Sequence, residues 1–158
     1  MKAFQQVLFL CTANFYRSRH AEFVFNYLSL REGLEWRARS AGFRPYLAPE
    51  PLSHCVEKRL EELLIPLPTG TVSPRGVEVE DLSESSLVVA MNRVEHEPMI
   101  REEFPLWIDR VRYWEIKDWD CVPPEIALPM VESEVEQLMR SLLDGHALGC
   151  DRDILAEF

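Results

Sequence analysis

The sequence lacks a long apolar run. No stretch of about 18 consecutive apolar residues occurs in it, and about that many are needed to cross a lipid bilayer, so we expect no contact with a membrane. The short apolar run near the N-terminus leads directly into a cysteine-containing motif. Cleavage of a secretory signal there would cut through the motif, so we expect no such signal.

Cysteine is scarce as well. The sequence has four cysteines, Cys11, Cys55, Cys121 and Cys150, whose spacing matches neither a zinc site nor a compact disulfide framework. Reduced thiols are the better interpretation, and they predict a cytoplasmic location. We expect no bound metal and no cofactor.

Positive charge is in short supply. The chain has 17 Lys and Arg against 27 Asp and Glu, a net charge of −10. Because nucleic-acid binding relies on neutralising phosphates with Lys and Arg, we expect no nucleic-acid partner. The imbalance is uneven, since residues 1–60 hold nine Lys or Arg and five acids, whereas residues 61–158 hold eight and 22. The N-terminal part can therefore present a local field that attracts a small anion.

The length and the hydrophobic pattern indicate one α/β domain. The 158 residues, 47% of them hydrophobic, suffice for a single core. Apolar runs alternate with helical periodicity, which predicts a four-stranded parallel sheet with helices on both faces. We expect strands at 6–10, 35–41, 87–91 and 110–116, helices at 18–31, 53–64, 93–103 and 129–143, a polar irregular segment at 69–86, a helix end at Gly145 and a mobile tail at 147–158. We expect a monomer.

The chemically informative stretch follows the first expected strand. Cys11 ends the apolar run, and a short loop leads to Arg17 and Ser18, where a helical pattern begins. The first N–H groups of a helix have no internal partner and its dipole is positive there, so this loop can hold a phosphate against Cys11. The same field favours a thiolate, Arg17 can hold two phosphate oxygens, and Ser18 can donate a hydrogen bond. The alternative is a buried structural cysteine with a capping arginine.

This motif resembles that of the low-molecular-weight protein tyrosine phosphatases. An apolar strand and then Cys-x-x-Asn-x-x-Arg-Ser open that family, and Cys11, Asn14, Arg17 and Ser18 match the pattern. The resemblance implies a single phosphotyrosine phosphatase I-like domain over residues 1–158. It also implies hydrolysis of phosphotyrosine or small aryl phosphates through a phosphocysteine intermediate, with Cys11 as the nucleophile. A phosphate or sulfate ion would occupy the loop.

The resemblance also implies a general acid in a loop after the last strand. Asp118 falls at that position, although Trp119 stands where the family has proline. Asp120 is the competing candidate, and two merely solvated acids are the third possibility. Loops at the carboxyl ends of parallel strands share one edge of the sheet, so Asp118 should face Cys11.

The remaining loop residues are expected to bind substrate. Loop N–H groups and Arg17 would hold the equatorial phosphate oxygens. Asn14 would keep the loop shape, because asparagine tolerates positive φ. The aromatic side chains would wall a slot for a ring or serve only as scaffold. The predicted substrate-binding residues are Thr12, Ala13, Asn14, Phe15, Tyr16, Ser18 and Trp119.

Three residues elsewhere are assigned supporting roles. Ser40, which begins a family-like Ser-Ala-Gly, is expected to support the loop by hydrogen bonding or simply to end a strand. Arg75 matches the arginine of a family element that steadies the loop. His20, in the first turn of the expected helix, is predicted to be a surface or capping residue.

Departures from the family keep other functions open. Ala13, Tyr16 and Arg19 stand where many members have glycine, a second cysteine and proline. Tyr16 therefore removes the partner that could protect Cys11 as a disulfide. One alternative is an arsenate reductase, which would need further cysteines such as Cys121. The other is a non-catalytic phosphate- or phosphopeptide-binding module that lacks an effective acid.

Overall fold

The computed structural model describes residues 4–70 and 73–147. Within these residues, four strands form one sheet in the order β2-β1-β3-β4, and every neighbouring pair is parallel. The strands are β1 (Gln5–Cys11), β2 (Trp36–Gly42), β3 (Leu87–Ala90) and β4 (Val111–Tyr113). The predicted four-stranded parallel sheet is therefore confirmed.

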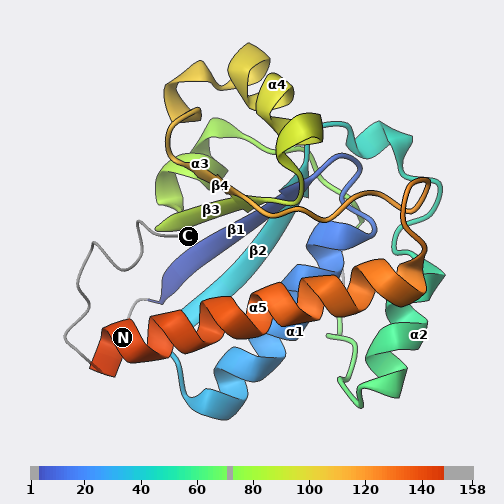
Figure 1. Ribbon diagram of the computed structural model, residues 1–158, viewed down its shortest axis with the longest axis vertical. Coiled ribbons are helices and arrows are strands. Elements are labelled where there is room, and N and C mark those ends of the chain that lie inside the picture. Colours follow the sequence, from blue (N-terminus) through green and yellow to red (C-terminus); the bar gives the residue numbers. More distant parts are fainter. Residues whose placement is uncertain (1–3, 71–72, 148–158) are drawn as a thin grey trace.

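Helices cover both faces of the sheet, as predicted (Figure 1). On one face lie α1 (Arg17–Glu32) and α5 (Pro124–Ala147), with α2 (His54–Glu62) beside them, and on the other lie α3 (Val79–Glu84) and α4 (Arg93–Glu103). Two single turns of 3₁₀ helix, Pro45–Leu47 and Pro105–Trp107, complete the described elements.

The place of β1 inside the sheet explains why its residues 7–10 form an unbroken apolar run. Val7 and Phe9 join the core cluster beneath α1 and α5, whereas Leu8 and Leu10 join the cluster beneath α3 and α4. All four side chains have 0% exposure. A strand covered on both faces needs apolar residues at every position, and this places Cys11 at the end of a rigid element.

Two expectations in the C-terminal half were wrong. The segment 69–86, expected to be irregular, contains α3, whose first turn is held by a reciprocal capping box between Glu78 and Asp81. The last helix begins at Pro124 rather than at 129 and continues through Gly145. Pro129 did not mark its start, because the preceding Ala127 and Leu128 are buried against the core and extend the helix by a turn.

The other boundaries agree within a few residues, and α4 agrees at both ends. The last strand is shorter than expected and ends at Tyr113. Residues 148–158 of the predicted tail lie outside the described residues. No helix in the described part of the chain is both long and apolar enough to cross a membrane.

Candidate active site

The loop between β1 and α1 surrounds the sulfur of Cys11. Cys11 is 2% exposed. Its Sγ accepts a hydrogen bond from the Asn14 N–H at 3.3 Å and lies 2.8 Å from Ser18 Oγ. The loop therefore brings a backbone N–H and a hydroxyl to this sulfur.

Asn14 fixes the shape of this loop. Its φ is 58°, the left-handed conformation that asparagine tolerates better than most residues. Its Nδ2 donates to Ser18 Oγ at 2.9 Å and to Ser40 Oγ at 3.0 Å. Its Oδ1 accepts the backbone N–H of Arg75 at 3.1 Å. The predicted support from Ser40 is therefore present, and Arg75 contributes through its backbone.

The end of β2 also approaches the loop closely. A Cβ placed on Gly42 would lie 2.7 Å from Thr12 O and 2.9 Å from Asn14 N. Real Cβ atoms do not come so near to backbone atoms, so a glycine is required where β2 passes the loop between β1 and α1.

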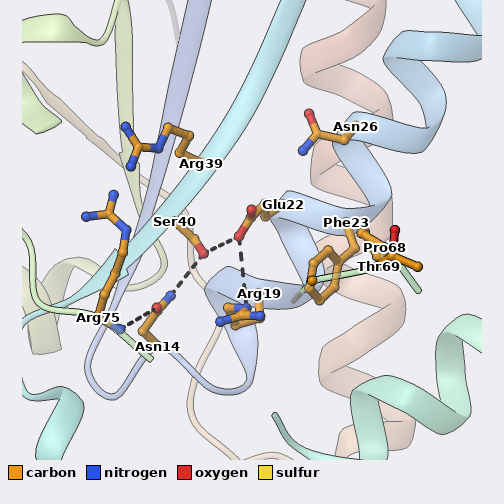
Figure 2. Close-up of a pocket in the computed structure, with 11 residues that line it drawn as sticks. Asn14, Arg19, Glu22, Phe23, Asn26, Arg39, Ser40, Pro68, Thr69 and Arg75 are labelled. Carbon is orange, nitrogen blue, oxygen red and sulfur yellow. Dashed lines mark hydrogen bonds and ion pairs between the residues drawn. The ribbon is translucent and has the colours of Figure 1, made fainter. Parts of the chain in front are cut away.

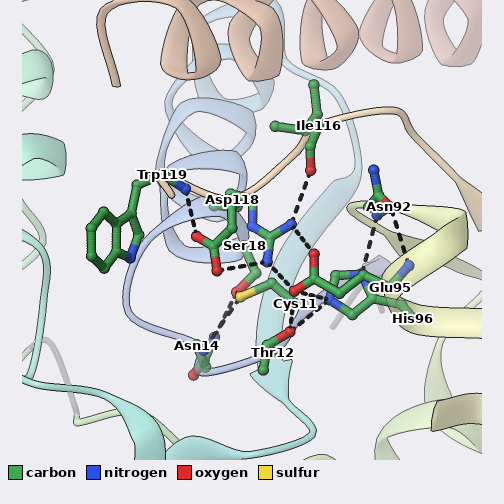
Figure 3. A network of polar contacts seen from close by, with 11 residues as sticks. Cys11, Thr12, Asn14, Ser18, Asn92, Glu95, His96, Ile116, Asp118 and Trp119 are labelled. Carbon is green, nitrogen blue, oxygen red and sulfur yellow. Dashed lines mark hydrogen bonds and ion pairs between the residues drawn. The ribbon is translucent and has the colours of Figure 1, made fainter. Parts of the chain in front are cut away.

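Arg17 takes part in a network of polar contacts, and Figure 3 labels its partners Glu95, Ile116 and Asp118. Its side chain is 2% exposed. Its Nη1 donates to Ile116 O at 2.9 Å and to Glu95 Oε2 at 2.8 Å, and its Nη2 donates to Glu95 Oε1 at 2.7 Å. Asp118 Oδ2 lies 3.3 Å from the same Nη2. The guanidinium thus links α1, α4 and the chain that follows β4.

Glu95 is the site residue that the sequence interpretation missed. Burial alone would raise the pKa of its carboxyl, but hydrogen bonds from His96 and Arg17 outweigh burial and hold that pKa well below its usual range. Glu95 also accepts a hydrogen bond from the Thr12 hydroxyl. Glu95 is therefore an anion that fixes both Arg17 and the first residue of the loop.

The sequence signal at Glu95 pointed to a different role. Asn92 caps α4 by accepting the Glu95 N–H at 3.1 Å, and Asn-x-x-Glu is typical of a capping box. In that box the glutamate reaches back to the N-cap N–H. Here His96 Nδ1 accepts the Asn92 N–H at 3.1 Å instead, which leaves the Glu95 carboxylate to bind Arg17.

His96 is a neutral donor in this arrangement. It is fully buried, and burial is the main reason that its pKa is lowered. Because Nδ1 accepts a backbone N–H, the ring proton belongs on Nε2, which lies 3.0 Å from Thr12 Oγ1 and 3.4 Å from Glu95 Oε1. The imidazole therefore steadies the Thr12–Glu95 contact.

Asp118 reaches the edge of the sheet where Cys11 lies. It follows β4, as predicted, and its Oδ1 accepts the Trp119 N–H at 2.9 Å. Of the two aspartates considered as the acid, Asp118 is the one in contact with Arg17. Asp120 is exposed and lines a groove of about 410 Å³ together with Asp118, Glu95 and Glu115.

The three predicted aromatic residues meet in one cavity. Phe15, Tyr16 and Trp119 line a hollow of about 250 Å³, which the start of α2 and Pro124 complete. Trp119 is 59% exposed, whereas Tyr16 is 3% exposed, and burial raises the pKa of the Tyr16 hydroxyl. The backbone joins the two sides of the hollow, because the Ser53 N–H at the start of α2 donates to Phe15 O at 2.9 Å.

The other predicted binding residues lie in the same loop, next to Cys11 in the chain. Ala13 is buried within the loop, and Thr12 is half-buried. No group of three or more His, Cys, Asp or Glu residues able to hold a metal ion occurs in the described part of the chain.

Comparison with known proteins agrees with this geometry. A family model for low molecular weight phosphotyrosine protein phosphatase matches residues 6–145. The chain belongs to this family. It is accordingly a hydrolase of the low molecular weight phosphatase type.

Three relatives show how far the likeness extends. The protein-arginine-phosphatase of Bacillus subtilis (strain 168) is 34% identical over 106 residues, which are 66% of this chain and 67% of that protein. The crystal structure of a low molecular weight protein tyrosine phosphatase from T. tengcongensis is 27% identical, with a TM-score of 0.72 over 86% of this chain and 98% of its own. A mutant of the arginine phosphatase YwlE with a phosphorylated active-site serine is 25% identical, with a TM-score of 0.71 over 95% and 99%.

Proposed function

We propose that this chain hydrolyses phosphotyrosine and small aryl phosphates through a covalent phosphocysteine at Cys11. The observation that carries the substrate class is the apolar cavity between Phe15, Tyr16 and Trp119. Because Trp119 follows Asp118 directly, an aromatic leaving group held in this cavity lies beside the proposed acid.

In the first step, the Cys11 thiolate attacks phosphorus in line with the leaving oxygen. The S–P bond forms as the P–O bond breaks, and Asp118 gives its proton to the departing phenolate. Charge on the three equatorial oxygens is stabilised by the loop N–H groups and by Arg17. Glu95 is a positioning residue, because it fixes the plane of the guanidinium with two hydrogen bonds.

In the second step, the Asp118 carboxylate takes a proton from water as the water oxygen attacks phosphorus. The S–P bond breaks and the sulfur leaves as a thiolate, which Ser18 Oγ, 2.8 Å away, stabilises by donating a hydrogen bond. The phosphorylated active-site serine of the YwlE mutant supports a covalent intermediate in this scheme. The steps use no metal or cofactor, and inorganic phosphate is the product.

The test is hydrolysis of p-nitrophenyl phosphate between about pH 4.5 and 8 without added metal. We expect turnover by the parent, none by Cys11→Ser, and a loss of about 10²–10⁴-fold in kcat for Asp118→Asn, the range that general acid catalysis contributes. Asp120→Asn is the matched control and should retain parental turnover. If Asp120→Asn is slow and Asp118→Asn is not, the acid is misassigned. A folded parent that binds phosphate without turnover would instead be a binding module.

Phosphoarginine is the second candidate substrate. The groove beside Asp118 is lined by Glu95, Glu115 and Asp120, and these acids would attract a cationic guanidinium leaving group. The 34% identical relative is named a protein-arginine-phosphatase. Comparing kcat/KM for one peptide carrying either phosphotyrosine or phosphoarginine separates the two. We expect phosphotyrosine to be preferred, and a preference for phosphoarginine would overturn the aryl assignment.

Arsenate reduction is a weaker candidate. It would require a second thiol to attack an adduct on Cys11, and the thiolate is the reactive form. Cys121, on the loop after Asp118, is hydrogen-bonded to Asp120, and that carboxylate raises the pKa of the Cys121 thiol. We therefore favour the phosphatase. We also propose a cytoplasmic location, where Cys11 stays reduced, and a monomeric state.

A further inference from the structure

A second cavity adjoins the catalytic loop at Asn14 (Figure 2). Its volume is about 280 Å³, and Arg19, Arg39 and Arg75 all line it. The three arginines come from α1, from β2 and from the chain before α3. None of them belongs to the proposed catalytic machinery, so their meeting at one cavity needs its own explanation.

The partners of these arginines differ. Arg75 is ion-paired with Asp81 at 2.8 Å and 3.1 Å. Arg19 lies 4.0 Å from Glu22, and its guanidinium stacks over the Phe23 ring at 5.2 Å. No hydrogen bond or ion pair joins the Arg39 guanidinium to another residue of the described ranges, and Figure 2 draws it without a dashed line.

The cavity carries excess positive charge in a protein whose net charge is −10. Glu22 is the one carboxyl group among the described residues that line it. Burial raises the pKa of Glu22, although the Ser40 hydroxyl donates to it. A protonated Glu22 would add no negative charge and could itself donate a hydrogen bond to an anion.

We propose that this cavity is a second anion site, which binds inorganic phosphate or sulfate between the guanidinium groups of Arg39 and Arg75. Guanidinium groups match the geometry of tetrahedral oxyanions through paired N–H donors. The cavity volume of about 280 Å³ leaves room for a tetrahedral oxyanion. The hydroxyl of Thr69 lines the same cavity, whereas the Asn26 amide in its wall is hydrogen-bonded to the backbone of Ala38.

Hydrogen bonds connect this site to the nucleophile. The backbone N–H of Arg75 donates to Asn14 Oδ1, and Asn14 Nδ2 donates to Ser18 Oγ. Ser18 Oγ in turn lies 2.8 Å from Cys11 Sγ. An anion that holds Arg75 in place therefore stabilises the catalytic loop from behind. Phosphate, the product of the proposed reaction, can in this way support the loop that releases it.

Diffraction from crystals soaked in selenate tests the location. The parent should show two anomalous peaks, one in the loop at Arg17 and one between Arg39 and Arg75. Arg39→Gln should lose the second peak and keep the first. Arg31→Gln removes the same charge at the far end of α1 and should keep both. A parent without the second peak, or an Arg39→Gln variant that retains it, overturns the proposal.

A titration in solution tests whether the site fills outside crystals. The free energy of unfolding is measured against sulfate at constant ionic strength. At saturating sulfate, each occupied site contributes the same slope to a plot of the free energy of unfolding against the logarithm of sulfate concentration. The parent, with two sites, should therefore have twice the slope of Arg39→Gln, which keeps one. Arg31→Gln should match the parent. Equal slopes for the parent and Arg39→Gln would mean binding at crystal concentration only and would overturn the proposal.

The inhibition of p-nitrophenyl phosphate hydrolysis by phosphate reports the loop site separately. The inhibition constant should weaken by only about two- to threefold in Arg39→Gln, because the second anion supports the loop indirectly, through Arg75 and Asn14, and Arg31→Gln should match the parent. A tenfold weaker inhibition in Arg39→Gln would place its effect in the loop and contradict an independent second site. Absence of turnover would count against the proposed phosphatase activity, while the selenate peaks and sulfate slopes would still decide the second site.

Discussion

At the scale of single residues, Arg17 brings together parts of the chain that are far apart in sequence. Glu95 on α4, the carbonyl of Ile116 and the carboxylate of Asp118 all contact its guanidinium. A free arginine side chain has many rotamers, and each contact removes some of that freedom before substrate arrives. This preorganisation is what gives electrostatic catalysis its effect.

Replacing Glu95 tests how much this positioning matters. Glu95→Gln loses the negative charge and one of two acceptors, and hydrogen bonds to charged groups contribute about 1.5–3 kcal/mol. We therefore expect kcat/KM for p-nitrophenyl phosphate to fall about 10–100-fold, because Arg17 becomes mobile. Steady-state kinetics supply the measurement.

Glu97→Gln is the matched control for Glu95→Gln. Glu97 lies on the same helix, where it pairs with Arg93 and Arg101 on the surface. Exposed pairs of this kind contribute little, so its kcat/KM should stay within about twofold of the parent. Similar losses in the two variants would show that α4 acts only through its overall charge.

The residues of the loop could be predicted from the sequence, and Asp118 and Ser40 from the family resemblance, whereas the long-range contact of Glu95 could not. Cys11, Asn14, Arg17 and Ser18 are grouped by one loop, so their spacing along the chain already describes their meeting. Glu95 joins them only through the fold, because α4 follows β3 and β3 pairs with β1. Its position three residues after Asn92 is typical of a capping box, and no local pattern separates a capping glutamate from one that binds a distant arginine.

At the scale of elements, an ion cluster joins three helices. Glu132 on α5 accepts from Arg59 on α2 at 2.7 Å and 2.8 Å and lies 2.8 Å from His20 Nε2 on α1. His20 was expected at the surface and is instead fully buried. The prediction failed because the partner of His20 lies 112 positions away in sequence. Burial is the main reason that the pKa of His20 is lowered.

The Glu132 cluster predicts a loss of stability in acid. Burial opposes it, but hydrogen bonds from Arg59 and His20 lower the pKa of Glu132 from 4.5 to about 2. The stabilisation is therefore fully present above about pH 4.5 and is lost as the pH falls toward 2. The stability advantage of the parent over Glu132→Gln should shrink by on the order of 2–3 kcal/mol between about pH 6 and pH 2.

Urea unfolding followed by circular dichroism measures this change in stability across pH. Glu136→Gln, on the exposed side of α5, serves as the control, and its difference from the parent should stay constant with pH. If the stability difference between the parent and Glu132→Gln also stayed constant with pH, Glu132 would bind the same number of protons in the folded and unfolded states, which would contradict the prediction.

Most elements were predictable because their signals are local. β1 and β3 are unbroken apolar runs, and α4 has a capping asparagine at one end and a proline just past the other. In contrast, α3 has six residues, mostly polar, and is held by its cap and one buried leucine. Such a short helix is stable only through tertiary contacts, which the local sequence does not show. Its polar composition therefore could not be distinguished from that of a loop.

At the scale of the whole molecule, charge selects among substrates. The net charge is −10, and Glu95, Glu115 and Asp120 outnumber Lys117 in the groove beside Asp118, so we expect a negative field there, while Arg17 would attract the phosphate. Fields of this kind act on association over about one Debye length, roughly 10 Å at 0.1 M salt.

This field predicts a preference for basic peptides. A phosphotyrosine peptide flanked by lysines should have a several-fold higher kcat/KM than the same peptide flanked by glutamates at about 0.02 M salt. At about 0.5 M salt the difference should largely disappear, because the surface charges are screened. A preference that persists at high salt would point to direct side-chain contacts instead of the long-range field.

The burial of Arg17 implies that thermal stability and the proposed turnover place opposite demands on this position. Its 2% exposed guanidinium and the carboxylates around it have lost most of their hydration, and well-packed apolar side chains often stabilise a fold better than such a network does. A directed-evolution library screened for thermal tolerance alone is therefore expected to drift toward apolar replacements at Arg17 and Glu95. The selected variants would have higher thermal stability but would lack the proposed activity, so the screen must also measure turnover in every round.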